Sequence, residues 1–300
     1  MSELIEGAAV ALGGPRGMAV TRTLPNKVRR TVGAWCFLDA YGPDDLAGRP
    51  GMRVGPHPHI GLQTVSWLVR GEILHRDSLG NRQEIRPGQL NLMTAGRGIS
   101  HAEETPAVNS GVLHGVQLWV ALPETARHQP PAFTHHADLP VVRLGGLTAT
   151  VLIGELGGAA SPAAAHTPLV GAEIAGASGV VPLRSDFEYA VLAMDGAATV
   201  DGHALKPGPL LYLGTGRTSL AVTAGPDARL LLLGGEPFEE SLVMWWNFVG
   251  RSHEEIVAAR AEWTAGDAFG EVHGYAGPPI PAPPMPATRL KPRPRSRFSA

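Results

Sequence analysis

GPHPHIGLQTVSWLVRGEILHRDSLGNRQEIRPGQLNLMTAGRGISHAEETP, residues 55–106, is the most strongly patterned segment of the chain. Short runs rich in apolar residues, such as Leu62 to Leu68 and Leu90 to Thr94, alternate with turn signals at Gly71 and Pro87-Gly88. Many short strands separated by turns are typical of a β-sandwich or β-barrel. The segment therefore predicts an all-β body.

The second half of the chain repeats this punctuation. Gly196 and Pro207-Gly208 stand where Gly71 and Pro87-Gly88 stand in the first half, which indicates an internal duplication. Between the halves, residues 128–168 are a mixture of loops, and 300 residues suffice for two domains of ordinary size. We expect a boundary between two lobes in this region.

One clear amphipathic helix is predicted, from Ser252 to Trp263. Ser252 suits the N-cap position, and Glu255 stands three residues later, as in a capping box. Ile256, Ala259 and Trp263 fall on one face of this helix. We expect that face to pack against a barrel.

The end of the chain, residues 276–300, is a tail rich in proline and arginine. It has no acidic residue, and its basic residues are Arg289, Lys291, Arg293, Arg295 and Arg297. Because such a segment cannot form a core, we expect it to be disordered or draped over the surface. It could contact an acidic partner, although a run of this kind is more often a solvated terminus.

Composition excludes several classes of function. A formal net charge of -2 gives no general reason for direct nucleic-acid binding. The single cysteine, Cys36, cannot form an internal disulfide, and the start MSELIEGAAVALGG lacks the basic and apolar parts of a signal peptide. No uninterrupted apolar run approaches the roughly 20 residues that cross a bilayer as a helix. We expect a cytoplasmic protein that does not span a membrane.

Two short motifs point to a metal site. His57-Pro58-His59 places two imidazoles on one face of an extended strand, and His101-Ala102-Glu103 repeats that spacing. On neighbouring strands the two pairs would give three nitrogens and one carboxylate around one ion, with coordination positions left open. Such donors suit Fe(II), Ni(II), Mn(II), Cu(II) or Zn(II). Taken alone, however, an HxH or HxE pair is more often a surface strand or a chance pairing.

The segment 55–106 as a whole resembles the N-terminal half of pirins, which belong to the cupin superfamily. HPH, HRDSLGN, PG, MTAGRGI and HAE stand in the order and spacing of that family, followed by His114-Gly115-Val116-Gln117-Leu118-Trp119 as the next strand. The second half is similar to the C-terminal part of bacterial pirins in two places: LGGEP, residues 233–237, and VMWWNFVG, residues 243–250. The resemblance therefore runs from about Arg22 to Gly270.

The resemblance implies a bicupin, which is two stacked jelly-roll β-barrels with a short C-terminal helix. A metal-binding cupin domain would span residues 1–140, and a cupin domain without metal would span residues 141–275. The residues that carry over as metal ligands are His57, His59, His101 and Glu103. Fe(II) is the metal expected first, with Ni, Mn, Cu and Zn as alternatives.

This chain departs from many pirins after the HPH motif, where Ile60, Leu62 and Gln63 replace Arg, Phe and Glu. Because a neutral amide binds a cation poorly, we expect Gln63 beside the ligands rather than among them. In the second lobe only Asp186 and Glu188 share the i, i+2 relation, and we predict no metal there. His75 is expected to be exposed or structural. The expected substrate pocket is lined by Met52, Leu62, Gln63, Met93, His114 and Gln117.

Two functions follow from the resemblance. The first is an enzyme similar to quercetin 2,3-dioxygenases, in which O2 opens the heterocycle of a flavonol with loss of carbon monoxide and Glu103 acts as general base. The second is a regulatory protein that acts through protein partners, as a transcription cofactor or a modulator of metabolic enzymes, with the redox state of the iron as the signal. We favour the enzyme because the site is open and no dedicated interaction module is visible.

Overall fold

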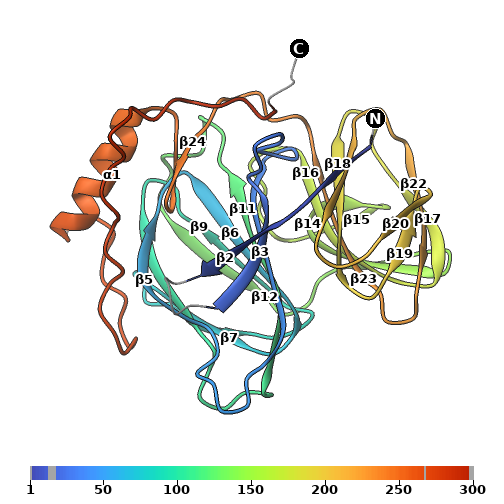
Figure 1. Ribbon diagram of the computed structural model, residues 1–300, viewed down its shortest axis with the longest axis horizontal. Helices are drawn as coiled ribbons and strands as arrows, with labels where there is room; N and C mark the ends of the chain where they lie inside the picture. The colour runs from blue at the N-terminus through green and yellow to red at the C-terminus, as the bar shows by residue number, and fades with distance from the viewer. Residues whose placement is uncertain (1, 13–17, 267, 297–300) are drawn as a thin grey trace.

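The computed structural model describes residues 2–12, 18–266 and 268–296 of the chain. The polypeptide folds into two β lobes that lie side by side, with the helix α1 (His253–Ala265) at the outer edge of the N-terminal lobe (Figure 1). The prediction of an all-β protein built from two stacked cupin lobes is confirmed. No helix in the described ranges is long and apolar enough to span a bilayer.

The N-terminal lobe consists of two antiparallel sheets that face each other. The larger sheet has the strand order β12-β9-β6-β11-β4-β3-β2, and the smaller has the order β5-β10-β7-β8. Their bounds are β2 (Ala8–Leu12), β3 (Met18–Leu24), β4 (Trp35–Asp45), β5 (Arg53–His59), β6 (Leu62–Arg70), β7 (Ile73–Asp77), β8 (Arg82–Ile85), β9 (Leu90–Thr94), β10 (Ile99–Glu104), β11 (Val112–Ala121) and β12 (Ala132–His136).

The C-terminal lobe repeats this order of paired strands, with β1 in the place of β12 and β15 as an addition. Its sheets have the orders β1-β21-β18-β23-β16-β14-β13, with β15 paired to β14, and β17-β22-β19-β20. The bounds are β1 (Glu3–Ile5), β13 (Val141–Leu144), β14 (Leu147–Leu156), β15 (Ala159–Ala160), β16 (Leu169–Gly176), β17 (Ser178–Pro182), β18 (Glu188–Asp195), β19 (Ala198–Val200), β20 (His203–Leu205), β21 (Leu210–Gly214), β22 (Ser219–Ala224) and β23 (Arg229–Gly235). The predicted duplication is thus confirmed, with β6 to β9 equivalent to β18 to β21.

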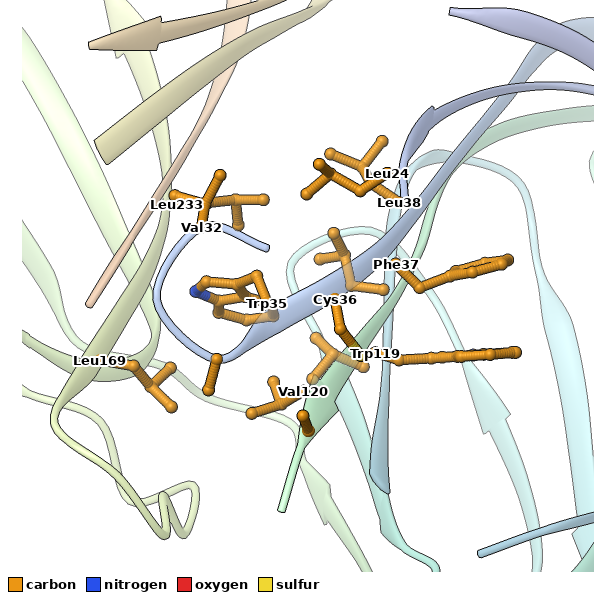
Figure 2. Close-up of a cluster of buried hydrophobic side chains, with 14 of the residues drawn as sticks. Leu24, Val32, Trp35, Cys36, Phe37, Leu38, Trp119, Val120, Leu169 and Leu233 are labelled. Carbon is orange, nitrogen blue, oxygen red and sulfur yellow. The ribbon is translucent and has the colours of Figure 1, made fainter. Parts of the chain in front are cut away.

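One of the hydrophobic clusters spans both lobes. Trp35, at the start of β4, reaches from the first lobe toward Leu169 and Leu233 of the second (Figure 2). Its indole Nε1 donates to the carbonyls of Val170 and Gly234, at 3.1 and 3.2 Å. A Cβ on Gly171 would lie 2.8 Å from this ring, so glycine is needed for the close approach. The lobes therefore pack as one body.

The two ends of the chain cross between the lobes. Strand β1 pairs with β21 in the C-terminal lobe, whereas the hairpin of β24 (Val243–Trp245) and β25 (Phe248–Gly250) and the helix α1 lie on the N-terminal lobe. The tail then runs back over the same lobe (Figure 1) and bonds to Pro56 and Leu242 through its backbone. The lobes thus exchange segments across the expected divisions at residues 140 and 275.

Helix α1 begins as expected. The Ser252 side chain accepts a hydrogen bond from the Glu255 backbone N–H at 3.2 Å, which confirms the N-cap. The Glu255 carboxylate accepts from the Arg251 backbone N–H rather than completing the capping box. Ile256 and Ala259 are buried against the hairpin, so the predicted face does pack on a lobe.

Candidate metal centre

The HPH and HAE motifs lie side by side on β5 and β10. In this antiparallel pair His101 stands opposite His57, and the register shifts between His101 and Glu103. All four candidate side chains are buried, with exposed fractions of 6% for His57, 1% for His59, 1% for His101 and 7% for Glu103. The structure therefore brings the two motifs together inside the first lobe.

The three histidines converge on one point. The candidate donor atoms of His57, His59 and His101 all lie within 4.8 Å of one another, and the Nε2 atoms of His59 and His101 are 3.0 Å apart. Glu103 forms a second group with His101 and His75, whose candidate donor atoms also lie within 4.8 Å of one another. Three imidazoles at this spacing, with the Glu103 carboxylate beside His101, are a donor set that fits a divalent transition metal.

Burial keeps these imidazoles neutral. It lowers the pKa of His57 to about 4 and takes the pKa values of His59 and His101 well below 6.5, with a further contribution to each from the neighbouring histidines. Burial also raises the pKa of Glu103. Because a metal binds the neutral imidazole, the site is ready at neutral pH without losing protons from its histidines.

The hydrogen bonds of the rings direct the Nε2 lone pairs inward. His57 Nδ1 lies 2.8 Å from the Gly55 carbonyl, and His59 Nδ1 lies 3.0 Å from the Asn247 carbonyl. A carbonyl only accepts, so each Nδ1 carries the proton and each Nε2 keeps its lone pair. The second of these carbonyls comes from the β24–β25 turn, 188 residues away in the sequence.

His101 has a different support, made of His75 and Asp77. His101 Nδ1 lies 3.4 Å from His75 Nδ1, and His75 Nε2 lies 3.1 Å from Asp77 Oδ2. Burial alone would raise the pKa of Asp77, but hydrogen bonds from His75 and Asn81 outweigh it and lower that pKa. An ionised Asp77 requires a proton on His75 Nε2, so His75 Nδ1 accepts from His101, and His101 Nε2 is left free.

His75 is therefore not exposed. It is 2% accessible and stacks on Phe133 with ring centroids 4.4 Å apart. Of the two roles expected for it, exposed or structural, the structure fits the structural one. Its i, i+2 relation to Asp77 is the same spacing that marks the HPH and HAE motifs. That spacing could have indicated the pair from sequence.

A cavity of about 440 Å³ opens beside the histidines. Of the six residues expected to line it, Met52 and Gln117 do so, and Leu62, Gln63, Met93 and His114 do not. Gln63 Nε2 donates instead to Thr94 Oγ1 and to the Ala164 carbonyl, and His114 Nε2 contacts the Met194 carbonyl. Adjacent residues of a strand face opposite sides, so Gln63 points away from the face on which Thr64 lines the cavity.

The cavity has an aromatic wall and a polar end. Phe37 and Trp119 stack at 3.9 Å between centroids, and Trp119 meets His59 edge-on at 5.2 Å. At the polar end Ser66 Oγ lies 3.0 Å from Gln117 Oε1 and 3.3 Å from Glu103 Oε1. The Gln117 amide nitrogen is buried with no hydrogen-bond partner among the described residues. A planar ligand with oxygen substituents would match these surfaces.

Asp186 and Glu188, the i, i+2 pair of acids in the second lobe, are both engaged in ion pairs. Asp186 pairs with Arg184 at the surface. Glu188 is fully buried, where it accepts from the Gly33 N–H and the Tyr212 hydroxyl and pairs with Arg295 at 3.1 Å. Glu188 therefore joins the second lobe to the tail.

The protein has two packed cupin lobes, and the first holds converging histidines and a carboxylate beside a cavity. It is therefore a cupin protein with a candidate metal centre. Comparison with known families is more specific: residues 17–120 match the family described as Pirin, and residues 174–270 match the Pirin C-terminal cupin domain. The chain belongs to the pirin family.

Individual relatives cover nearly the whole chain. A Pseudomonas aeruginosa protein provisionally named a quercetin 2,3-dioxygenase is 47% identical over 94% of this chain and 90% of its own. A pirin-like protein of Caulobacter vibrioides is 39% identical over 82% and 88%. The crystal structure of a quercetin 2,3-dioxygenase from Acinetobacter baumannii has a TM-score of 0.92 at 43% identity, covering 96% and 97%. Escherichia coli YhhW, solved with nickel(II), shares the fold at a TM-score of 0.60 and 18% identity.

Proposed function

We propose that this protein is a metal-dependent dioxygenase that opens the ring of quercetin or a related flavonol, acting in the cytoplasm with Fe(II) as its metal. The metal would be held by His57, His59, His101 and Glu103, and Ni, Mn, Cu and Zn fit the same donors. The observation that carries the proposal is the convergence of three Nε2 lone pairs at the end of a cavity with an aromatic wall. The names of the P. aeruginosa and A. baumannii relatives support it.

When bound, the metal would supply Lewis acidity for a substrate oxygen and redox chemistry toward O2. The chain's own residues accept the proton and orient the substrate. Glu103 is the general base for the flavonol hydroxyl, because its carboxylate lines the cavity beside the histidines and can accept a proton when it loosens from the metal. Ser66, which contacts both Glu103 and Gln117, holds the base in place.

Other cavity residues bind and orient the flavonol. The stacked pair of Phe37 and Trp119 provides a flat apolar surface for its rings. The unpartnered amide nitrogen of Gln117 would donate to a ring oxygen of the substrate. Trp246 and Ile280, from the hairpin and the tail, also line the cavity and help to exclude water.

The test is turnover by the iron-loaded protein: with quercetin it should consume O2 and release carbon monoxide. Glu103→Gln should lower kcat by roughly 10²–10⁴-fold, whereas Glu262→Gln, at an exposed position of α1, should leave kcat unchanged. Metal content measured on both variants separates loss of the base from loss of the ion. Turnover that survives chelation would refute the proposal.

A regulatory role through a protein partner is the second candidate, because the same donors would hold a redox-active iron. Iron-loaded protein that does not turn over quercetin, but whose Fe(II) and Fe(III) forms differ in partner binding, would favour that role.

A further inference from the structure

Six cations surround a pair of adjoining depressions where the tail crosses the N-terminal lobe, far in sequence from the histidine motifs. The depressions have volumes of about 270 and 380 Å³, and Arg30 and Arg293 line both. We call this region the basic hollow. Its cations are Lys27, Arg30, Arg289, Lys291, Arg293 and Arg295.

Backbone pairing fixes these side chains close together. The Arg30 backbone N–H donates to the Arg295 carbonyl at 2.8 Å, and Arg293 exchanges two backbone hydrogen bonds with Leu242 at 2.8 and 2.9 Å. Burial, together with the charge of Arg293, lowers the pKa of Arg30. The fold thus holds like charges together in a protein whose overall charge is -2.

Four of these six cations, among them Lys27, have no carboxylate partner among the residues with described positions. Arg289 pairs with Glu254 and Arg295 with Glu188, but no ion pair involves Arg30, Lys291 or Arg293. The one acid lining the hollow is Glu240, which already binds Arg251. The hollow therefore has an excess of positive charge that an anion would neutralise. Arg297 lies outside the described residues.

The floor of the 270 Å³ depression is apolar. Leu242, Val243, Met244 and Leu290 line it beneath the charged rim. Guanidinium groups bind phosphate through paired N–H donors, and an apolar floor favours a ligand with a small hydrocarbon body. A duplex would require a long strip of cations, whereas these surround one depression. We propose that the basic hollow binds a small phosphate monoester, with its phosphate between Arg30 and Arg293.

Calorimetric titration of the metal-loaded full chain with phenyl phosphate, inorganic phosphate and phenol tests this. Phenyl phosphate should bind more tightly than inorganic phosphate because it also covers the floor, and phenol should not bind. The double variant Arg30→Gln/Arg293→Gln should lose at least about tenfold in affinity for phenyl phosphate. Neither arginine forms an ion pair with any residue that the structure describes, so thermal unfolding of this variant should match the wild type.

A matched control is Arg82→Gln/Arg143→Gln, which removes two exposed arginines elsewhere that have no ion pair within the described part of the chain, and which changes the net charge equally. This control should bind phenyl phosphate as the wild type does. Equal losses in both double variants would overturn the proposal, since they would show general charge attraction. So would binding to anionic lipid vesicles, an acidic peptide or duplex DNA without binding to phenyl phosphate.

Discussion

Replacing Asp77 by asparagine should weaken metal binding without touching a ligand. Asp77 Oδ1 accepts from the backbone N–H groups of Leu79 and Asn81, both at 3.0 Å, so the oxygen of an asparagine would stay on that side. Its NH2 group would then face His75 Nε2, which must become an acceptor. His75 would carry its proton on Nδ1, and His101 would have to move its own proton to Nε2, the atom needed by the metal.

The size of the effect follows from the contacts. Loss of a partner that orients a ligand histidine typically costs about 10- to 100-fold in metal affinity. The His75 to His101 distance of 3.4 Å is long for a hydrogen bond. We therefore expect a loss near the lower end, about 10- to 30-fold, or about 1.4 to 2 kcal/mol.

The assay is titration of metal-free protein with Ni(II) against a competing chelator, together with long-range proton–nitrogen NMR of the imidazole rings. The spectrum should show the proton of His101 on Nδ1 in the wild type and on Nε2 in Asp77→Asn. His75→Gln should keep affinity near wild type, since one amide can accept from His101 and donate to Asp77, whereas His75→Leu should not. Asp186→Asn is the control. Unchanged affinity and an unchanged His101 tautomer in Asp77→Asn would refute the reasoning.

Three further predictions address the ligands, the pH dependence and the core. His101→Ala should leave the protein with little metal by elemental analysis, whereas His203→Ala, at an exposed site, should retain it; equal metal contents would rule out this centre. In metal-free protein the free energy of unfolding should fall as the pH drops from 6.5 toward 4, because the unfolded chain binds a proton that folded His57, with a pKa of about 4, does not. Denaturant titrations should show a loss on the order of 3 kcal/mol from His57 alone, and a flat profile would contradict it. Trp35→Ala should lower the free energy of unfolding by about 3–5 kcal/mol, because the ring belongs to the cluster that spans both lobes. Both lobes should still unfold in one calorimetric transition, and two separate transitions in the wild type would contradict the shared cluster.

Local spacing explains how much of the site could be predicted. The i, i+2 rule alone places His57 beside His59 and His101 beside Glu103 on the same strand face, and the family resemblance supplied the pairing of the two strands. The rule applied equally to His75 and Asp77, but the hairpin that carries them looked exposed. Burial of that hairpin depends on Phe133, which arrives from a strand on the opposite sheet.

The parts that sequence could not predict depend on distant contacts. Leu62 and Gln63 were both expected at the cavity, although neighbours on a strand cannot face the same way, and the structure shows that Thr64 is the residue of this strand that lines the cavity. A three-residue strand such as β1 has no pattern that would assign it to the far lobe. The Asn247 carbonyl that fixes the His59 tautomer is a backbone atom, which leaves no trace in residue type.

The crossing of the chain ends has a consequence for biosynthesis. The histidine motifs leave the ribosome early, but the Asn247 carbonyl and the closing side chains of Trp246 and Ile280 are made only after the entire second lobe. A nascent chain therefore has the imidazoles before it has the Asn247 carbonyl, which fixes the His59 tautomer, and before it has the two side chains that help to exclude water. For the proposed metal, a complete and enclosed site therefore exists only after the whole chain has been synthesised.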